Sequence, residues 1–212
     1  MKLARFLLAP FLCAVIFGTI ALLVNQTAIA AETNSQPLIY FKARFIKVPE
    51  SSIGFILQSS TAVSTNEITT TEIIPAEKLR PVLHGLYDNY QYLVYAELEN
   101  VTPSGLPAQR NCDEPNYACE TNCAIDVRPM LSADGFTLNL KATASKPEKM
   151  GAQANVWDGQ TLAIIPPKSD GTNRLVVFVT VKLVDSAGSQ IHSDEELFSR
   201  EQKMKTAIPP QE

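Results

Sequence analysis

The sequence predicts an α+β protein, with a mainly antiparallel sheet built from hairpins, one packed helix and a short C-terminal helix. Three observations support this prediction. Segments of alternating apolar and polar residues recur along most of the chain, as in half-buried strands. Asp-Gly pairs at 134–135 and 158–159 stand between such segments, where the glycine can supply the positive φ of a tight turn. One long segment near residue 80 instead has apolar residues at helical spacing.

The first thirty residues have the features of a secretory signal peptide. Lys2 and Arg5 precede an apolar run over 6–24, and Ala28-Ile29-Ala30 forms a small-x-small cleavage site before polar residues. We therefore expect residues 1–30 to be removed and the remaining chain to be exported. The alternative is an uncleaved N-terminal anchor, because the apolar run is nearly long enough to span a bilayer.

The composition indicates one acidic domain. The chain has 212 residues and a formal net charge of −4, and loss of the two basic residues in the signal makes the exported part more acidic. An acidic chain without a basic cluster argues against nucleic acid as a partner. We expect a β-rich domain over 31–188 and a polar tail over 189–212 that contains a short helix.

The N-terminal half of this domain is expected to contain a strand, an ambiguous segment and the helix. LIYFKARFIKVP alternates from Ile39 and ends at Pro49, as a half-buried strand does. IGFIL, within 50–71, is expected to form a short strand or turn. The helix is predicted from apolar residues at i, i+3, i+4 and i+7, which are Leu79, Val82, Leu83 and Leu86. Pro81 would cost a hydrogen bond inside it, so either the helix kinks or a turn over 76–80 leads to a helix that starts at Pro81.

The C-terminal half is expected to be built from hairpins. After a strand over 92–98, AIDVRPML and FTLNLKATAS should pair through the Asp134-Gly135 turn, and 154–157 should pair with 160–165 through Asp158-Gly159. The most apolar segment, 174–184, should be a central strand covered on both sides. We expect all these strands to form a single twisted layer of about six to eight strands. Ser193 and Glu196 fit a capping box that opens a helix to about residue 205.

Three cysteines remain after export: Cys112, Cys119 and Cys123. An oxidising compartment favours one disulfide among them. Cys112 and Cys123 flank an acidic loop as two ends of a hairpin would, and Cys112–Cys119 is the other pairing considered. A metal site is less favoured, because three cysteines at these spacings without a nearby histidine match zinc patterns poorly.

The sequence contains no recognisable catalytic motif. His84 lies beside the helical stripe and His192 in the polar tail, too far apart in sequence to indicate a catalytic set. Asp134 and Asp158 are interpreted as turn formers, and Trp157 as a packing residue. We therefore expect neither an enzyme nor a cofactor-binding protein.

Five segments, in order, resemble the C-terminal core of the secretins, the ring-forming outer-membrane proteins of type II and type III secretion and of pilus systems. They are ARFIKVPE, the helix with the following YQYLVYAELENVTPSGLPAQ, AIDVRPMLSADGFTLNLKATAS, NVWDGQTLAII and RLVVFVTVKLVDSAG, and together they cover most of 39–188. The residues that match the family's motifs are Asp134, Gly135, Asp158, Gly159, Gln160, Thr161, Phe178 and Thr180.

The chain also departs from the family. Secretins follow their D-G-Q-T strand with Gly-Gly and a long segment that carries a proline- and glycine-bearing signature, whereas here Ile165 leads directly into PPKSDGTN. KPEKMGAQ is likewise shorter than the corresponding family segment, and no strand pair long enough for a membrane barrel is predicted.

The resemblance therefore implies a shortened, non-catalytic envelope protein at the periplasm or the periphery of the outer membrane. It would be an accessory or assembly component of a secretion or pilus system, with copies of itself or the apparatus proteins as partners. The alternative is a stand-alone periplasmic binding or adaptor domain that keeps only the fold.

Overall fold

The computed structural model describes residues 36–65, 69–90, 92–112, 123–146, 149–167 and 171–207; the predicted signal peptide and Cys119 lie outside these ranges. The described elements are β1 (Leu38–Pro49), the 3-10 turn η1 (Glu50–Ser52), α2 (Ile53–Gln58), β2 (Thr61–Thr65), β3 (Thr70–Ile74), α3 (Ala76–Tyr90), β4 (Leu93–Pro103), β5 (Ala108–Cys112), β6 (Cys123–Leu131), β7 (Thr137–Lys146), β8 (Met150–Trp157), β9 (Thr161–Ile165), β10 (Asn173–Val184) and α4 (Asp194–Ala207). The predicted α+β class with mainly antiparallel strands is confirmed.

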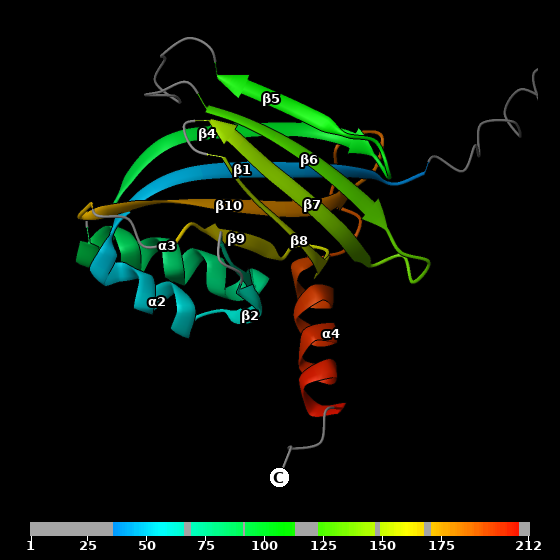
Figure 1. The fold of residues 1–212 in the computed structure, drawn as a ribbon. Helices are drawn as coiled ribbons and strands as arrows, with labels where there is room; N and C mark the ends of the chain where they lie inside the picture. The colour runs from blue at the N-terminus through cyan, green and yellow to red at the C-terminus, as the bar shows by residue number, and fades with distance from the viewer. Residues whose placement is uncertain are drawn as a thin grey trace, which may run out of the picture. The chain divides into compact units, whose positions relative to one another are not determined.

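The strands form two sheets that pack face to face (Figure 1). The six-stranded sheet has the order β2-β3-β9-β10-β1-β4 and the four-stranded sheet the order β5-β6-β7-β8. One apolar cluster fills the space between the sheets, and a second lies between the six-stranded sheet and α2 and α3. The predicted single layer is therefore wrong. Alternation identifies a strand's buried side, but it does not say whether a helix or a second sheet covers that side.

Strand β1 contributes to both clusters and shows how the layers are arranged. Phe41 and Phe45 point into the core between the sheets, whereas Ile46 and Val48 belong to the core under the helices. The even-numbered residues of β1 share one face because side chains alternate along a strand. That face changes from polar at Tyr40, Lys42 and Arg44 to apolar at Ile46 and Val48. Only the apolar part of this face lies in the helix-covered core. The polar part lies outside that core, where it can line a functional site.

Helix α3 begins at Ala76 and continues through Pro81, so no separate turn precedes the helix. It buries Val82 and Leu86 against the sheet. Gly85 lets α2 approach closely, since a Cβ at this position would lie 2.6 Å from Cζ of Phe55.

The IGFIL segment is α2, and the expected strand or turn is wrong. Ile53 and Ile56, three residues apart, are both buried in the cluster under α3. A six-residue helix is too short for sequence periodicity to distinguish it from a strand, and its packing against α3 decides the conformation.

The hairpin predicted at Asp158-Gly159 is also wrong, although a tight turn is present. Strand β8 pairs with β7 in the four-stranded sheet, whereas β9 pairs with β10 and β3 in the six-stranded sheet. The turn is thus a corner between sheets, and Gly159 takes the expected positive φ of 83°. All five residues of β9 are buried, which requires cover on both faces that a two-stranded hairpin does not supply.

The other predicted features of this half are confirmed. β6 and β7 pair antiparallel across the Asp134-Gly135 turn, with Leu131 opposite Leu138. Strand β10 lies centrally, between β1 and β9, and is buried along most of its length. Helix α4 begins at Asp194, and the Ser193 hydroxyl accepts a hydrogen bond from the Glu196 N–H at 3.2 Å, as in the predicted cap.

Substitution of Gly159 tests the corner. Gly159→Ala should lower the free energy of unfolding by about 2–3 kcal/mol, because the left-handed φ costs a non-glycine residue roughly 1–2 kcal/mol and overpacking adds to it. The added Cβ would lie 2.8 Å from Cδ1 of Leu197. Gly135→Ala is the matched control: its φ is +70°, but no heavy atom lies within 4 Å of the added Cβ.

We expect the control to cost about 1 kcal/mol, measured by urea unfolding. In a Leu197→Ala background, Gly159→Ala should lower the free energy of unfolding by less than it does in the wild type, because the added Cβ no longer meets Cδ1 of Leu197. Equal losses for the two glycine substitutions would contradict a packed corner.

Candidate functional site

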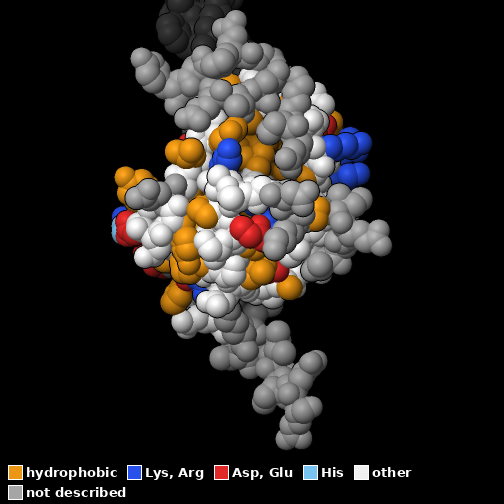
Figure 2. Space-filling model, turned by 60° about the vertical axis from the view of Figure 1, so that its left-hand side comes forward, with side chains coloured by type: hydrophobic (Ala, Val, Ile, Leu, Met, Phe, Trp, Pro, Cys, Tyr) orange, Lys and Arg blue, Asp and Glu red, His pale blue; other side chains and the backbone are white. Residues whose placement is uncertain are grey.

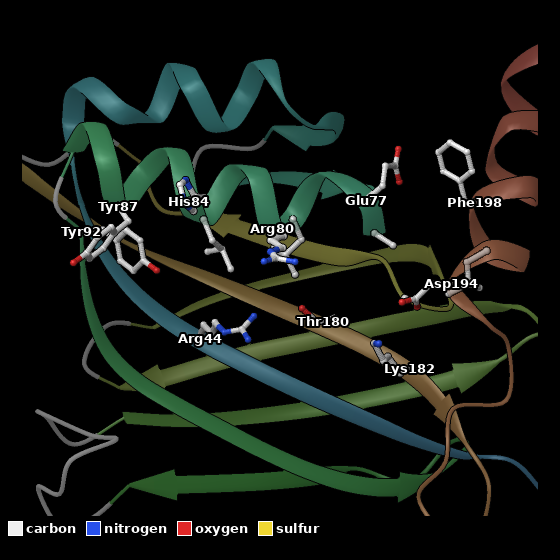
Figure 3. A pocket seen from close by; sticks show the side chains of 15 residues that line it. Arg44, Glu77, Arg80, His84, Tyr87, Tyr92, Thr180, Lys182, Asp194 and Phe198 are labelled. Atoms are coloured by element: carbon white, nitrogen blue, oxygen red, sulfur yellow. The ribbon is translucent and has the colours of Figure 1, made fainter.

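A pocket of about 590 Å³ lies along α3, between this helix and the six-stranded sheet (Figure 3). Its floor is formed by Arg44 on β1 and by Thr180 and Lys182 on β10, and α3 and the start of α4 form its sides. The floor residues belong to the same sheet face as Ile46 and Phe178, which lie under the helices. The polar-to-apolar change along this face therefore creates the pocket.

The polar floor continues outward from the pocket as an ionic ladder between β1 and β4. Glu97 accepts a hydrogen bond from Arg44 Nε at 2.6 Å and lies 2.7 Å from Lys42 Nζ. Burial acts to raise the pKa of Glu97, but the hydrogen bonds from Lys42 and Arg44 outweigh it and lower that pKa. Beside it, the Tyr40 hydroxyl donates to Glu99 at 2.6 Å, and burial together with this acidic neighbour raises the pKa of Tyr40.

Aromatic side chains stand at both ends of the pocket. Tyr87 and Tyr92 meet edge to face with ring centroids 6.1 Å apart at one end, and Phe198 lies at the other (Figure 3). Tyr87 is 64% exposed and Phe198 is 48% exposed. Leu79 and Leu83 of α3 line the pocket between these ends. The site thus combines a cationic floor with apolar walls.

The Asp158 corner forms one wall of this pocket. The Asp158 side chain is fully buried and accepts a hydrogen bond from the Leu183 N–H at 2.8 Å, while its other oxygen lies 2.8 Å from His192 Nδ1. Burial raises the pKa of Asp158, although the hydrogen bonds from Leu183 and His192 oppose this effect. The Gly159 N–H donates to the Val181 carbonyl at 2.9 Å, so the corner is bonded directly to β10.

The two Asp-Gly turns lie at the same end of the protein. The Asp158 N–H donates to the carbonyl of Phe136, which follows the Asp134-Gly135 turn, at 3.1 Å. The Phe136 ring contacts the ring of His192, with centroids 5.4 Å apart, and the guanidinium of Arg200 lies over it at 4.6 Å. Asp134 accepts hydrogen bonds from the Thr137 hydroxyl and the N–H groups of Phe136 and Thr137, which lower its pKa.

The remaining motif residues have structural positions near this corner. The Gln160 side chain accepts a hydrogen bond from the Trp157 N–H at 2.9 Å, and Phe178 is fully buried under the helices. The buried hydroxyls of Thr161 and Thr180 share a hydrogen bond of 2.8 Å. Of the motif residues singled out in the sequence, Gly159 and Thr180 line the pocket, as do Leu79, Leu83 and His84 of the predicted helix.

Sequence reasoning missed the other lining residues, including Arg44, Arg80, Tyr87 and Lys182. They lie on three elements far apart in the chain. The only signal was the polar run Tyr40–Lys42–Arg44 on a strand face that turns apolar at Ile46.

Cys112 and Cys123 stand directly opposite each other on β5 and β6, as hairpin ends. Cys112 is disulfide-bonded, and Cys123 is buried. The sequence-based Cys112–Cys119 pairing stays a prediction, because Cys119 is one of the residues not described.

In the described ranges, no group of three or more His, Cys, Asp or Glu side chains is placed to hold a metal ion. No helix in these ranges is long and apolar enough to cross a membrane. Comparisons with protein-family models, with curated proteins and with solved structures found no match for this chain.

The buried Thr161–Thr180 pair predicts a non-additive effect of mutation. Thr180→Val should lower the free energy of unfolding by about 1–2 kcal/mol, because it leaves the buried Thr161 hydroxyl without its partner. The double substitution Thr161→Val with Thr180→Val should cost less than this single one, since both polar groups are removed. Urea unfolding measures both values, and additive losses would show that the hydroxyl bond does not couple the two strands.

Asp158 and Asp134 should give opposite pH dependences of stability. Because burial raises the pKa of Asp158 above its usual 3.8, its stabilisation is present at acidic pH and is lost as the pH rises through the raised pKa. The hydrogen bonds from Thr137 lower the pKa of Asp134, so its stabilisation is present above 3.8 and is lost as the pH falls through the lowered pKa.

Relative to the wild type, Asp158→Asn should therefore become less destabilising as the pH rises above 3.8, whereas Asp134→Asn should become less destabilising as it falls below 3.8. Unfolding by urea from acidic to neutral pH measures both differences. Parallel curves for the two variants would contradict the opposite environments of these carboxyl groups.

Proposed function

We propose that this chain is an exported, secretin-like and non-catalytic envelope protein that acts as an accessory or assembly component of a type II or type III secretion system or a pilus system. Support comes from the arrangement of the five secretin-like segments. They form β1, α3 with β4, β6 with β7, β8 with β9, and β10, which together make most of both sheets. Three of the five segments are joined at the Asp158 corner.

A short connection in the six-stranded sheet supports the proposed shortened form. β9 and β10 pair directly, with Ile164 opposite Val177, and only residues 166–172 connect them. This connection stands where the secretin sequence pattern has its long signature segment. A chain of this form would act through the surfaces of its sheets. The two described histidines have structural partners, because His84 and His192 are each bonded to an aspartate.

The outer face of the four-stranded sheet is the surface that best suits assembly, and it carries the proposal. Across β7 and β8 this face holds mostly uncharged polar side chains, and Asn139 is hydrogen-bonded to both Asn155 and Gln153. Interface cores are depleted of charged residues, and over 137–145 and 150–157 this face holds one, Lys141, to which β6 adds Asp126 and Arg128. In the view of Figure 2, acidic and basic side chains are dispersed among hydrophobic ones.

Strand β4, at the edge of the six-stranded sheet, is less suited to pairing with another chain. Arg110 Nε donates to the Glu99 carbonyl at 2.9 Å, and the Asn100 side chain accepts from the Val101 N–H at 2.9 Å. These side chains occupy backbone groups that an added strand would need.

A second candidate function, a periplasmic binding or adaptor domain, is favoured by the pocket beneath α3. Its volume falls within the range of roughly 300–1,000 Å³ typical of small-ligand sites, and it combines apolar walls with a few polar groups.

Assembly is tested by native mass measurement and chemical crosslinking of the exported chain, alone and with the envelope fraction. We expect a multimer or a complex with secretion or pilus proteins that Gln153→Arg dissociates, because it adds a charge to the exposed outer face of β8. Gln58→Arg, on the exposed surface of α2, makes the same change elsewhere and should leave the complex intact.

A monomer under all conditions, with no envelope protein captured, would overturn the assembly proposal in favour of the binding domain. Equal effects of the two arginine substitutions would show that the outer face of the four-stranded sheet is not the contact.

A further inference from the structure

We propose that the pocket beneath α3 binds an amphipathic anion, that is, a carboxylate or phosphate group attached to an apolar body. This inference specifies a ligand for the binding-domain alternative and does not depend on assembly. It rests on the charges at the centre of the pocket and the apolar groups at its ends (Figure 3).

Three cationic side chains from three elements line the pocket: Arg44 on β1, Arg80 on α3 and Lys182 on β10. Figure 3 shows Arg80 reaching from the helix toward the strands that carry Arg44 and Lys182. Cations that converge from both sides of a pocket favour a bound anionic group, which each can contact.

Existing interactions leave much of this positive charge available. Glu97 binds Arg44 through Nε, and the terminal nitrogens of Arg44 form no hydrogen bond with a described residue. Lys182 Nζ donates to the uncharged side chain of Gln190 at 2.9 Å. Arg80 has neither an ion pair nor a hydrogen bond within the part of the chain that the structure describes.

Of the two acidic lining residues, Asp194 lies near Lys182, since Gln190 accepts from Lys182 and donates to Asp194 at 3.3 Å, whereas Glu77 lies farther from the cations. Glu77 and Asp194 lie toward the Phe198 end of the pocket in Figure 3. Asp194 is the first residue of α4, where the helix dipole favours a negative charge. The preferred position for a ligand's anionic group is therefore between Arg44, Arg80 and Lys182.

The apolar walls indicate what the anionic group is attached to. Leu79 and Leu83 of α3 lie beside the cations, and the exposed rings of Tyr87 and Phe198 stand at opposite ends. A free inorganic anion would leave these apolar surfaces in contact with water, whereas an acyl or aromatic body would cover them. Amphipathic anions match both parts of the lining.

Isothermal titration of the full exported chain with three probes of equal chain length tests the charge requirement. Dodecanoate and dodecyl phosphate, below their micelle concentrations, should bind with one site per chain, and dodecyltrimethylammonium should bind at least about tenfold more weakly. Added salt should weaken the binding of the anions. The ratio of the two anion affinities distinguishes a carboxylate ligand from a phosphate-bearing one.

The double variant Arg80→Gln with Lys182→Gln should weaken binding of the anions about tenfold or more, because two charge-assisted contacts are lost. Lys78→Gln with Lys149→Gln is the matched control: it removes the same charge from exposed positions outside the pocket and should bind as the wild type does. If the first double variant does not fold, Arg80→Gln alone changes only an exposed helical residue and should still weaken binding.

Three results would overturn the proposal: no binding of either anion, equal binding of the cationic probe, or equal losses in the control variant. Each is independent of the Gln153→Arg assembly result. A chain that assembles but binds no anion refutes only the pocket ligand, and one that binds anions as a monomer refutes only assembly.

Discussion

The buried carboxylate of Asp158 is the interaction on which the arrangement of both sheets depends. It bonds the Leu183 N–H of β10 and the His192 ring, at the point where the chain leaves one sheet and enters the other. A buried polar group needs such partners, because an unsatisfied one costs much more than a typical hydrogen bond contributes. Leu197 of α4 lies close against Gly159 at the same corner. One turn therefore links the crossing between the two sheets, the central strand β10 and the C-terminal helix α4.

The pocket follows from how this corner and α3 share the surface of the six-stranded sheet. The helices cover the face where β1 and β10 are apolar, at Ile46 and Phe178, and Arg44 and Thr180 of the same face line the pocket along α3. The corner and α4 then close one side through Gly159 and Leu197. Because Arg44 and Lys182 stand on strands and are hydrogen-bonded to Glu97 and Gln190, these two charged groups are held in place before a ligand arrives.

The two proposed activities use different faces of the protein. The outer face of the four-stranded sheet carries Asn139 and Gln153 and faces away from the shared core, whereas the pocket opens on the helix-covered face of the other sheet. Both faces belong to elements formed by the segments on which the proposed function rests. Assembly through one face and ligand binding at the other are therefore compatible in a single chain.

The sequence by itself determined β1, β4, β6 to β10, the main helix, the Asp-Gly turns and the α4 cap, but not β2, β3 and β5, because alternation, helical spacing, Asp-Gly pairs and Ser193 act over a few residues. Apart from the β6–β7 hairpin, only the tertiary structure decided which strands pair. The turn at Asp158-Gly159 allows a hairpin or a corner equally, and burial of β9 on both faces selects the corner. Arg44, Arg80 and Lys182 meet only after the chain has folded. Their proximity depends on packing between distant segments, which leaves no local pattern in the sequence.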